Sequence, residues 1–216
     1  MTNIIAKFQG SSGRVVVVSG HYDTYSRSGL KFVGANDAGS STGFLLELAR
    51  TLGRTSHRDS IWLIWFDGEE SLIQWADNDH TYGSRRLVAK WKADGTLSSI
   101  LALINVDMIG DAGLSLVYDS ASTPWLRELV WAVAGRLGYA AQFSRNFTMD
   151  VGDDHYPFLE AGVAAVDLID LDYGPGNSYW HTERDTEDKL SARSFEIVGQ
   201  VVLETLRALE QRSSPR

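Results

Sequence analysis

Five residues that can bind a metal ion lie far apart in the sequence, and most of them follow an apolar run. An apolar run that stops at an imidazole or a carboxylate indicates a buried strand that delivers this side chain to the carboxyl edge of a sheet. Open α/β sheets bind their ligands at that edge. Two imidazoles and three carboxylates suit zinc, so the sequence predicts a metalloenzyme. The five residues are His21 in VVVVSGHYDT, Asp37 in FVGANDAGSS, Glu70 in IWLIWFDGEE, Asp107 in LALINVDMIGD and His181 in SYWHTERDT.

The most specific local pattern is the pair of adjacent glutamates, Glu69 and Glu70, directly after the apolar run IWLIWF. Two carboxylates at the end of a buried strand are costly unless a site uses their charge. One of them can bind the metal while the other moves protons, as general acid–base catalysis requires. The alternative is an exposed acidic loop, which the apolar run before the pair disfavours.

Each of the other candidate ligands also has a purely structural interpretation. His21 could be a solvated loop residue, and Asp37 could be the N-cap of a following helix. Asp107 could be a hydrogen-bonded structural aspartate, and His181 could pack on Trp180 in a loop. The serines after Asp37 can cap the helix in its place. Asp107 is a lone acid inside an apolar run and therefore needs a partner. The metal interpretation is therefore preferred.

Two aspartates lie close to the histidines in the sequence. Asp23 follows His21 in GHYDT, and Asp185 follows His181 in HTERDT. A carboxylate that accepts the N–H of the ring nitrogen not bound to the metal fixes the tautomer of the imidazole. We therefore expect Asp23 and Asp185 to play this part.

A third acidic segment is DDHYPFLEAG, which begins with Asp153, Asp154 and His155 and is expected to form a short helix. Acidic residues favour helix N-termini, so capping explains one of the two aspartates but not both. Two tryptophans, Trp75 and Trp180, lie in expected loops beside Glu70 and His181. They either form an aromatic collar around a small pocket or fold back onto the core. His57 and His80 lie in polar segments and are predicted to be surface residues.

The elements that would position these residues alternate between strand and helix. This alternation predicts an α/β fold, a single-domain α/β/α sandwich with a mixed, mainly parallel central sheet. We expect one catalytic domain over residues 1–210 and a frayed tail over 211–216. Apolar periodicity predicts strands at 3–8, 14–19, 60–66, 100–106, 114–118 and 163–168, and helices at 40–52, 84–92, 124–137 and 191–209.

Length and composition limit the function classes. The chain has 216 residues, 44% of them hydrophobic, which fits one domain with a full core. A net charge of −8 argues against nucleic acid or an anionic membrane surface as a partner. No apolar stretch reaches the roughly 18 residues of a membrane-spanning helix, and the N-terminus lacks a signal-peptide pattern. The chain has no cysteine, which excludes disulfides and thiolate ligands.

With these residues in view, the chain resembles the M28 zinc-exopeptidase superfamily over nearly its whole length. The markers are GHYDT, GANDAGS, DGEE, NVDMIG and HTERDT, in that order. Within the superfamily the chain is most similar to the animal-type glutaminyl cyclases and their bacterial relatives, through FDGEESLIQW, DDHYPFLEAGV and YWHT. The resemblance implies a zinc enzyme that acts on the N-termini of peptides or proteins, and it suggests an extracytoplasmic location. It leaves the oligomeric state open.

The two branches of the superfamily imply different metal sites. In the aminopeptidases the residues matching His21, Asp37 and Asp107 hold one zinc, and those matching Asp37, Glu70 and His181 hold a second. In the glutaminyl cyclases a single zinc is held by the residues matching Asp37, Glu70 and His181. There the residue matching Glu69 moves protons, the matches of Asp107 and Asp153 hydrogen-bond to each other, and those of Trp75 and Trp180 flank the pocket.

Some features of the chain depart from the cyclases. GANDAGSST is more similar to the peptidases, and the usual disulfide cysteines of the cyclases are missing. In the other direction, an Asp107–Asp153 pair would share one proton, because two like charges in contact cannot both ionise cheaply. A proton-sharing Asp107 is a poor metal ligand, which favours the cyclase with one zinc. A two-zinc aminopeptidase and a non-catalytic zinc-folded binding module remain as alternatives. The free glutamate beside Glu70 argues against the binding module.

Overall fold

The computed structural model describes residues 1–76 and 78–212. Its centre is a five-stranded sheet with the strand order β1-β3-β2-β4-β7. Strand β1 runs antiparallel to β3, and the other neighbouring pairs are parallel. The predicted mixed, mainly parallel sheet is therefore confirmed. The strands are β1 (Ile4–Phe8), β2 (Val15–His21), β3 (Ser60–Phe66), β4 (Ile100–Asp107) and β7 (Ala165–Ile169).

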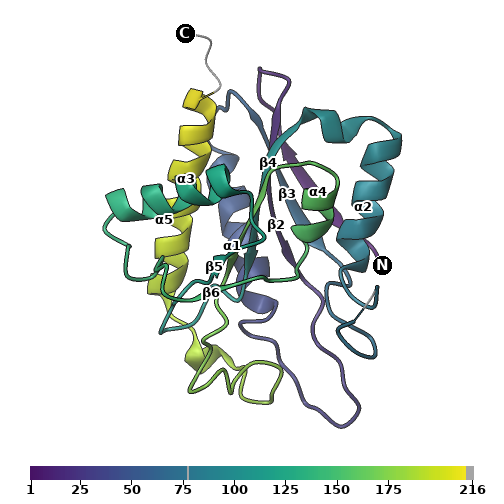
Figure 1. The fold of residues 1–216 in the computed structure, drawn as a ribbon, viewed down its shortest axis with the longest axis vertical. Coiled ribbons are helices and arrows are strands. Elements are labelled where there is room, and N and C mark those ends of the chain that lie inside the picture. The colour runs from purple at the N-terminus through teal and green to yellow at the C-terminus, as the bar shows by residue number, and fades with distance from the viewer. Residues whose placement is uncertain (77, 213–216) are drawn as a thin grey trace.

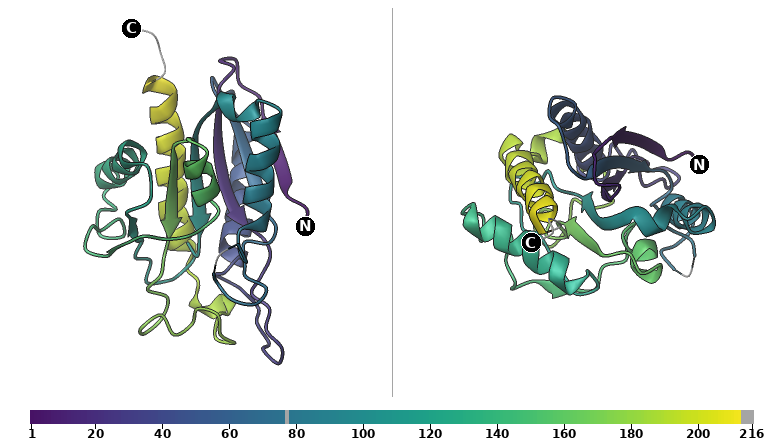
Figure 2. Two further views of the ribbon diagram at one scale, coloured as in Figure 1. Left: turned by 45° about the vertical axis from the view of Figure 1, so that its right-hand side comes forward. Right: turned by 90° about the horizontal axis from the view of Figure 1, so that it is seen from above.

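Helices cover both faces of this sheet, which gives the three layers seen in Figure 2. One face packs against α1 (Gly39–Leu52), α3 (Pro124–Arg136) and α5 (Ala192–Arg212). The other packs against α2 (Tyr82–Ala93) and the short α4 (Tyr156–Glu160). Shorter elements lie in the connections: the 3₁₀ turns η1 (Thr96–Ser99) and η2 (Glu187–Lys189), and the paired strands β5 (Tyr118–Asp119) and β6 (Thr148–Met149).

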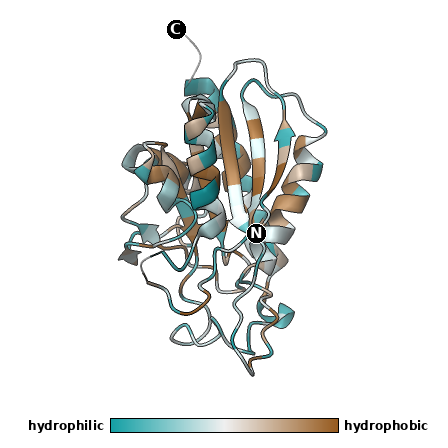
Figure 3. Ribbon diagram, turned by 90° about the vertical axis from the view of Figure 1, so that its right-hand side faces the viewer, coloured by the Kyte–Doolittle hydropathy of each residue, from teal (hydrophilic) through white to brown (hydrophobic). Residues whose placement is uncertain are grey.

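The central strands are buried along nearly their whole length because both faces of the sheet are covered. Every residue of β2 is buried. Val16 and Val18 belong to the core under α1, α3 and α5, while Val15 and Val17 belong to the core under α2 and α4. Successive side chains of a strand point to opposite faces, so one continuous apolar run serves two cores. Brown hydrophobic segments alternate with paler ones along the strands in Figure 3.

The parallel strands all end at one edge of the sheet. His21 is the last residue of β2 and pairs with Phe66, the last of β3. Asp107 is the last residue of β4 and pairs with Ile169, the last of β7. The long connections that follow these strands gather at the lower end of the molecule in Figure 1. This is the edge at which the sequence predicts the site.

Two of the expected elements have different bounds or a different form in the structure. The strand expected at 114–118 is replaced by an isolated bridge between Leu116 and Asp170 and by the short β5, because successive backbone N–H groups there donate to different segments. The amide of Leu116 donates to Gln142, and that of Val117 donates to Ile169. Helix α5 includes Gln211 and Arg212, which the sequence predicts as tail, and residues 213–216 lie outside the described residues.

Among the helices that the structure describes, none has the length and apolar character needed to cross a membrane.

Two neighbouring leucines of α1 test this packing. Leu45 is fully buried in the core, whereas Leu46 is 60% exposed. Replacing a buried leucine with alanine removes apolar contacts and leaves a cavity, at a cost of about 2–5 kcal/mol. We expect Leu45→Ala to lower the free energy of unfolding by this amount in urea titrations. The matched variant Leu46→Ala should change it by less than about 0.5 kcal/mol, and equal effects would contradict the packing described.

Candidate metal centre and active-site pocket

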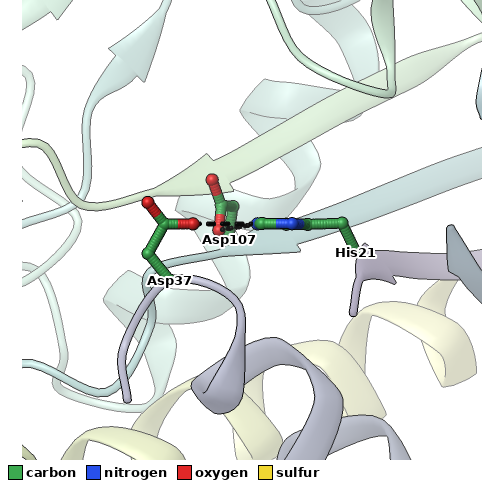
Figure 4. A group of neighbouring side chains, drawn as sticks. All are labelled: His21, Asp37 and Asp107. Atoms are coloured by element: carbon green, nitrogen blue, oxygen red, sulfur yellow. Dashed lines mark hydrogen bonds and ion pairs between the residues drawn. The ribbon is translucent and has the colours of Figure 1, made fainter. Parts of the chain in front are cut away.

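His21, Asp37 and Asp107 come together at the carboxyl edge of the sheet (Figure 4). The Nε2 atom of His21 lies 3.1 Å from Oδ1 of Asp37 and 3.2 Å from Oδ1 of Asp107. All three side chains are buried. His21 and Asp107 end adjacent strands of the sheet, so the strand register itself brings these two donors together.

A second donor group shares Asp37 with the first. It consists of Asp37, Glu70 and His181. The Nε2 atom of His181 lies 3.1 Å from Oε1 of Glu70 and 3.2 Å from Oδ2 of Asp37. Asp37 therefore directs one carboxylate oxygen to each histidine and bridges the two groups. The structure thus brings together all five residues that the sequence predicts as metal ligands.

The spacing of the donor atoms fits a zinc ion in either group. Within each group one ligand atom per residue lies within 4.8 Å of the others. Ligand atoms around a tetrahedral zinc with bonds of about 2.0–2.1 Å are about 3.3 Å apart, close to the separations of 3.1 and 3.2 Å found here. Oε2 of Glu70 is also buried without a hydrogen-bond partner among the described residues, as expected for a carboxylate that faces a cation.

The segment that carries Asp37 is fixed from its backbone side. Ala38 is the N-cap residue of α1 and no side chain caps this helix, so the capping interpretation of Asp37 is wrong. The carboxylate of Asp185 instead accepts the backbone N–H groups of Asn36 at 2.8 Å and of Asp37 at 3.1 Å. It also accepts the hydroxyl of the buried Tyr173 at 2.8 Å. Asp185 therefore holds the loop of Asp37 rather than the imidazole of His181.

Asp23 has the corresponding function for the two glutamates. Its carboxylate accepts the backbone N–H groups of Glu69 and Glu70, both at 3.1 Å. Its distance to Nδ1 of His21 is 3.7 Å, which is too long for a hydrogen bond. The prediction that Asp23 fixes the tautomer of His21 is therefore wrong in this structure. Neither aspartate binds an imidazole: Asp23 binds backbone amides, and Asp185 binds backbone amides and the hydroxyl of Tyr173.

His181 is held between two aromatic rings. The ring of Tyr25 stacks on it at a centroid distance of 4.0 Å and an angle of 3°, and Trp180 stacks at 4.2 Å. His181 also adopts a left-handed φ of 53°, a conformation that persists only where the surroundings impose it. His181 therefore packs on Trp180 and at the same time points its Nε2 atom toward Asp37 and Glu70. Tyr25 gave no signal in the sequence, because its loop has no periodic pattern.

Next to these donors is a pocket of about 330 Å³. Its floor includes Asp37, Glu70, Asp107 and His181, together with Glu69 and Asp153, and Trp75 and Trp180 are part of its wall. The two tryptophans are 44% and 41% exposed, which favours the aromatic collar over packing on the core. The ring of Trp75 stacks on His80 at 4.3 Å, so His80 supports the pocket wall instead of being a free surface residue.

The charge of the site is strongly negative. No lysine or arginine is among the described residues that line the pocket. Burial raises the pKa of Glu69 well above its usual value. The charge of His21 lowers this pKa, whereas the charges of Asp153 and Asp154 raise it further. Burial and then the charge of Asp107 raise the pKa of Asp153 to about 6. Burial lowers the pKa of His181, but its bonds with Asp37 and Glu70 outweigh this and raise it to about 9.

The start of α4 differs from the expectation of a capped helix. Its N-cap residue is His155, and no side chain caps it. Oδ1 of Asp153 accepts the backbone N–H of Asp154, and Nε2 of His155 lies 3.2 Å from Oδ2 of the buried Asp119. Among the described residues no hydrogen bond joins Asp153 to Asp107, although the resemblance to the cyclases implies one. The two carboxyl groups interact here through their charges.

The chain is similar to known proteins in sequence and in fold. The sequence matches peptidase family M28 over residues 3–206. A glutaminyl-peptide cyclotransferase of Drosophila melanogaster is 30% identical over 209 residues, which cover 85% of this chain and 58% of the fly protein. The crystal structure of an Acidobacteriales bacterium glutaminyl cyclase is 40% identical with a TM-score of 0.93, and the match covers 98% of this chain and 74% of that one.

A second similar structure is a Zn-dependent exopeptidase from Parabacteroides distasonis, which is 26% identical with a TM-score of 0.80. The match covers 94% of this chain and 76% of that chain. The chain spans little more than half the length of the fly protein, so the activities of these relatives apply to it only as proposals.

The buried Asp154 generates a test of the electrostatics beside the pocket. It is fully buried, and burial followed by the charge of Asp153 raises its pKa well above the usual value. An acid whose pKa is raised on folding destabilises the fold increasingly as pH rises above its unfolded value of about 3.9. We therefore expect Asp154→Asn to be more stable than the wild type at about pH 8, with a smaller difference at about pH 5.

Urea unfolding at both pH values measures this difference. Glu160→Gln is the matched control, because Glu160 is an exposed acid on α4, the short helix that follows Asp154. It should change the free energy of unfolding by less than about 0.5 kcal/mol at either pH. A lower stability of Asp154→Asn at the higher pH would show that the charged carboxylate is needed for the fold.

Proposed function

The chain belongs to peptidase family M28, and we propose that within this family it is a zinc-dependent glutaminyl cyclase. Its substrates would be peptides with an N-terminal glutamine, and its products pyroglutamyl peptides and ammonia. The observation that carries this proposal is the small pocket in which Glu69 lies beside Asp37, Glu70 and His181 under a collar of tryptophans. Its volume of about 330 Å³ is at the lower end for ligand sites, which suits one terminal residue. The similarity to two glutaminyl cyclases supports it.

Asp37, Glu70 and His181 would hold the zinc ion that faces the substrate. These three residues line the pocket, whereas His21 of the other group does not. A bound zinc ion supplies Lewis-acid polarisation of the γ-carboxamide oxygen of the glutamine. Asp23 and Asp185 keep the donors in place through the backbone amides of Glu70 and Asp37, as outer partners of metal ligands do.

Glu69 is the residue that moves the proton in this proposal. Its carboxylate takes a proton from the α-amine, whose nitrogen forms a bond with the side-chain carbonyl carbon of the glutamine. The bond between this carbon and the amide nitrogen then breaks, and Glu69 returns the proton to the nitrogen, which leaves as ammonia. Burial, and to a smaller extent the charges of Asp153 and Asp107, raise the pKa of Glu69 and so its affinity for the proton. The ring closes within one residue, so the substrate itself supplies the proximity.

A two-zinc aminopeptidase is the second candidate. It is favoured by the His21, Asp37 and Asp107 group, which has the spacing of a metal site and shares Asp37 with the first. The similarity to a Zn-dependent exopeptidase points the same way. In that case Glu69 would activate water against the first peptide bond. A purely structural zinc module is disfavoured, because such sites fill all four positions with ligands, whereas this donor group opens into a pocket.

Parallel assays distinguish the two enzymes. Ammonia release is measured with peptides that begin with glutamine, and amine release is measured with leucine anilides. We expect ammonia from the first substrates and no turnover of the second. Turnover of leucine anilides without ammonia release would contradict the cyclase assignment and support the aminopeptidase.

The metal assignment is tested by His181→Ala. Loss of one of three protein ligands should weaken zinc binding by more than about 100-fold, since even outer partners contribute 10- to 100-fold. Zinc content after dialysis against a chelator measures this loss. His57→Ala is the control, because His57 hydrogen-bonds to Leu52 outside both donor groups, and it should retain zinc. Equal zinc in both variants would overturn the assignment.

The catalytic assignment is tested by Glu69→Gln. This change keeps the side-chain shape and the backbone bond to Asp23 but removes the group that moves protons. The variant should bind zinc and fold as the wild type does, while kcat for ammonia release falls on the order of 10²- to 10⁴-fold. A kcat within about threefold of the wild type would make Glu69 a mere neighbour of the ligand Glu70.

A further inference from the structure

The mouth of the pocket carries several large apolar side chains, although its floor is charged. Four of the lining residues are large apolar side chains that are exposed to solvent: Met149 at 38%, Trp180 at 41%, Trp75 at 44% and Ile73 at 89%. Large apolar side chains that meet at one opening mark a surface that contacts a ligand or a partner. The floor below them carries the carboxylates and the imidazole of the proposed metal site. A molecule that fills the site therefore has a polar end and an apolar part that follows it outward.

The loop that presents Ile73 is held in a fixed conformation. The carboxylate of Asp79 accepts the backbone N–H groups of Leu72 at 3.1 Å, Ile73 at 2.8 Å and Gln74 at 2.9 Å. It also accepts the hydroxyl of Tyr82 at 2.5 Å, which ties the loop to α2. Three consecutive amides bound to one carboxylate fix the backbone from which Ile73 extends. A side chain on a pre-organised backbone binds a ligand with little further loss of entropy.

Ile73 is the outermost part of this apolar wall. It is about twice as exposed as Trp75 and Trp180, which flank the pocket floor. If the terminal glutamine occupies the floor and the collar, the next residue of the peptide leaves the pocket along the outer wall. We propose that Ile73 contacts the side chain of the second substrate residue and gives the enzyme a preference for apolar residues there. This inference rests on the proposed cyclase function.

Two glutaminyl peptides that differ only at the second residue, leucine or asparagine, test the preference. The two side chains have similar shapes and no charge, so the exposed Asp150 in the pocket lining forms an ion pair with neither. Partial burial of one aliphatic side chain is expected to raise kcat/KM for the leucine peptide by roughly 5- to 10-fold. In Ile73→Ser the ratio of kcat/KM for the leucine peptide to that for the asparagine peptide should fall to roughly twofold or less. Ile73→Leu, which keeps an aliphatic side chain, should retain the wild-type ratio.

Leu72→Ser is the matched control. Leu72 is the neighbouring exposed aliphatic residue, at 69%, but it does not line the pocket, so its loss should leave the ratio unchanged. A wild type without preference, or an Ile73→Ser variant that keeps it, would overturn the inference while ammonia release continues to support the cyclase. An equal loss in both serine variants would also overturn it, because the effect would then belong to the loop as a whole. Absence of ammonia release from every peptide would instead contradict the proposed function, and the inference with it.

Discussion

Five carboxyl groups are buried at one edge of one sheet. Asp37, Glu69, Glu70, Asp107 and Asp153 each have 6% or less of their surface exposed. Burying ionised carboxylates without partners is prohibitively costly, and such groups are instead paired, bound to metal or protonated. The two imidazoles pair with three of the five. The remaining negative charge calls for a cation and for retained protons, and a glutamate that retains or moves a proton beside a metal site is the chemistry proposed for Glu69.

The same arrangement of hydrogen bonds fixes the charged residues of the site at two places in the fold. Each histidine of the site is followed in the sequence by an aspartate that binds two consecutive backbone amides of a carboxylate-bearing segment. Asp23 binds the amides of Glu69 and Glu70, and Asp185 binds those of Asn36 and Asp37. Hydrogen bonds from amides to a carboxylate are stronger than those between neutral groups. The loops after β2 and β7 thereby fix the donors contributed by other segments, so the site depends on segments that are distant in the sequence.

The sequence predicted those parts of the structure that follow from strand ends. His21 and Asp107 terminate buried apolar runs, and the parallel register places them together. The partners of Asp23 and Asp185 could not be predicted, because they lie across irregular loops that have no periodicity. The same holds for the stacking of Tyr25 on His181 and of Trp75 on His80. The prediction of a strand at 114–118 was wrong for a related reason. A strand needs a continuous partner strand beside it, and an apolar run in the sequence does not show whether such a partner exists.

The central claim is that the Asp37, Glu70 and His181 group acts as a one-zinc cyclase site, although Asp37 also faces His21 and Asp107. The most direct measurement is a titration of the metal-free protein with zinc, in which bound metal per chain is counted while ammonia release from a glutaminyl peptide is followed. The account predicts that ammonia release is complete at one zinc per chain and does not rise with further zinc. Activity that appears only with the second zinc, on leucine anilides and without ammonia release, would contradict it.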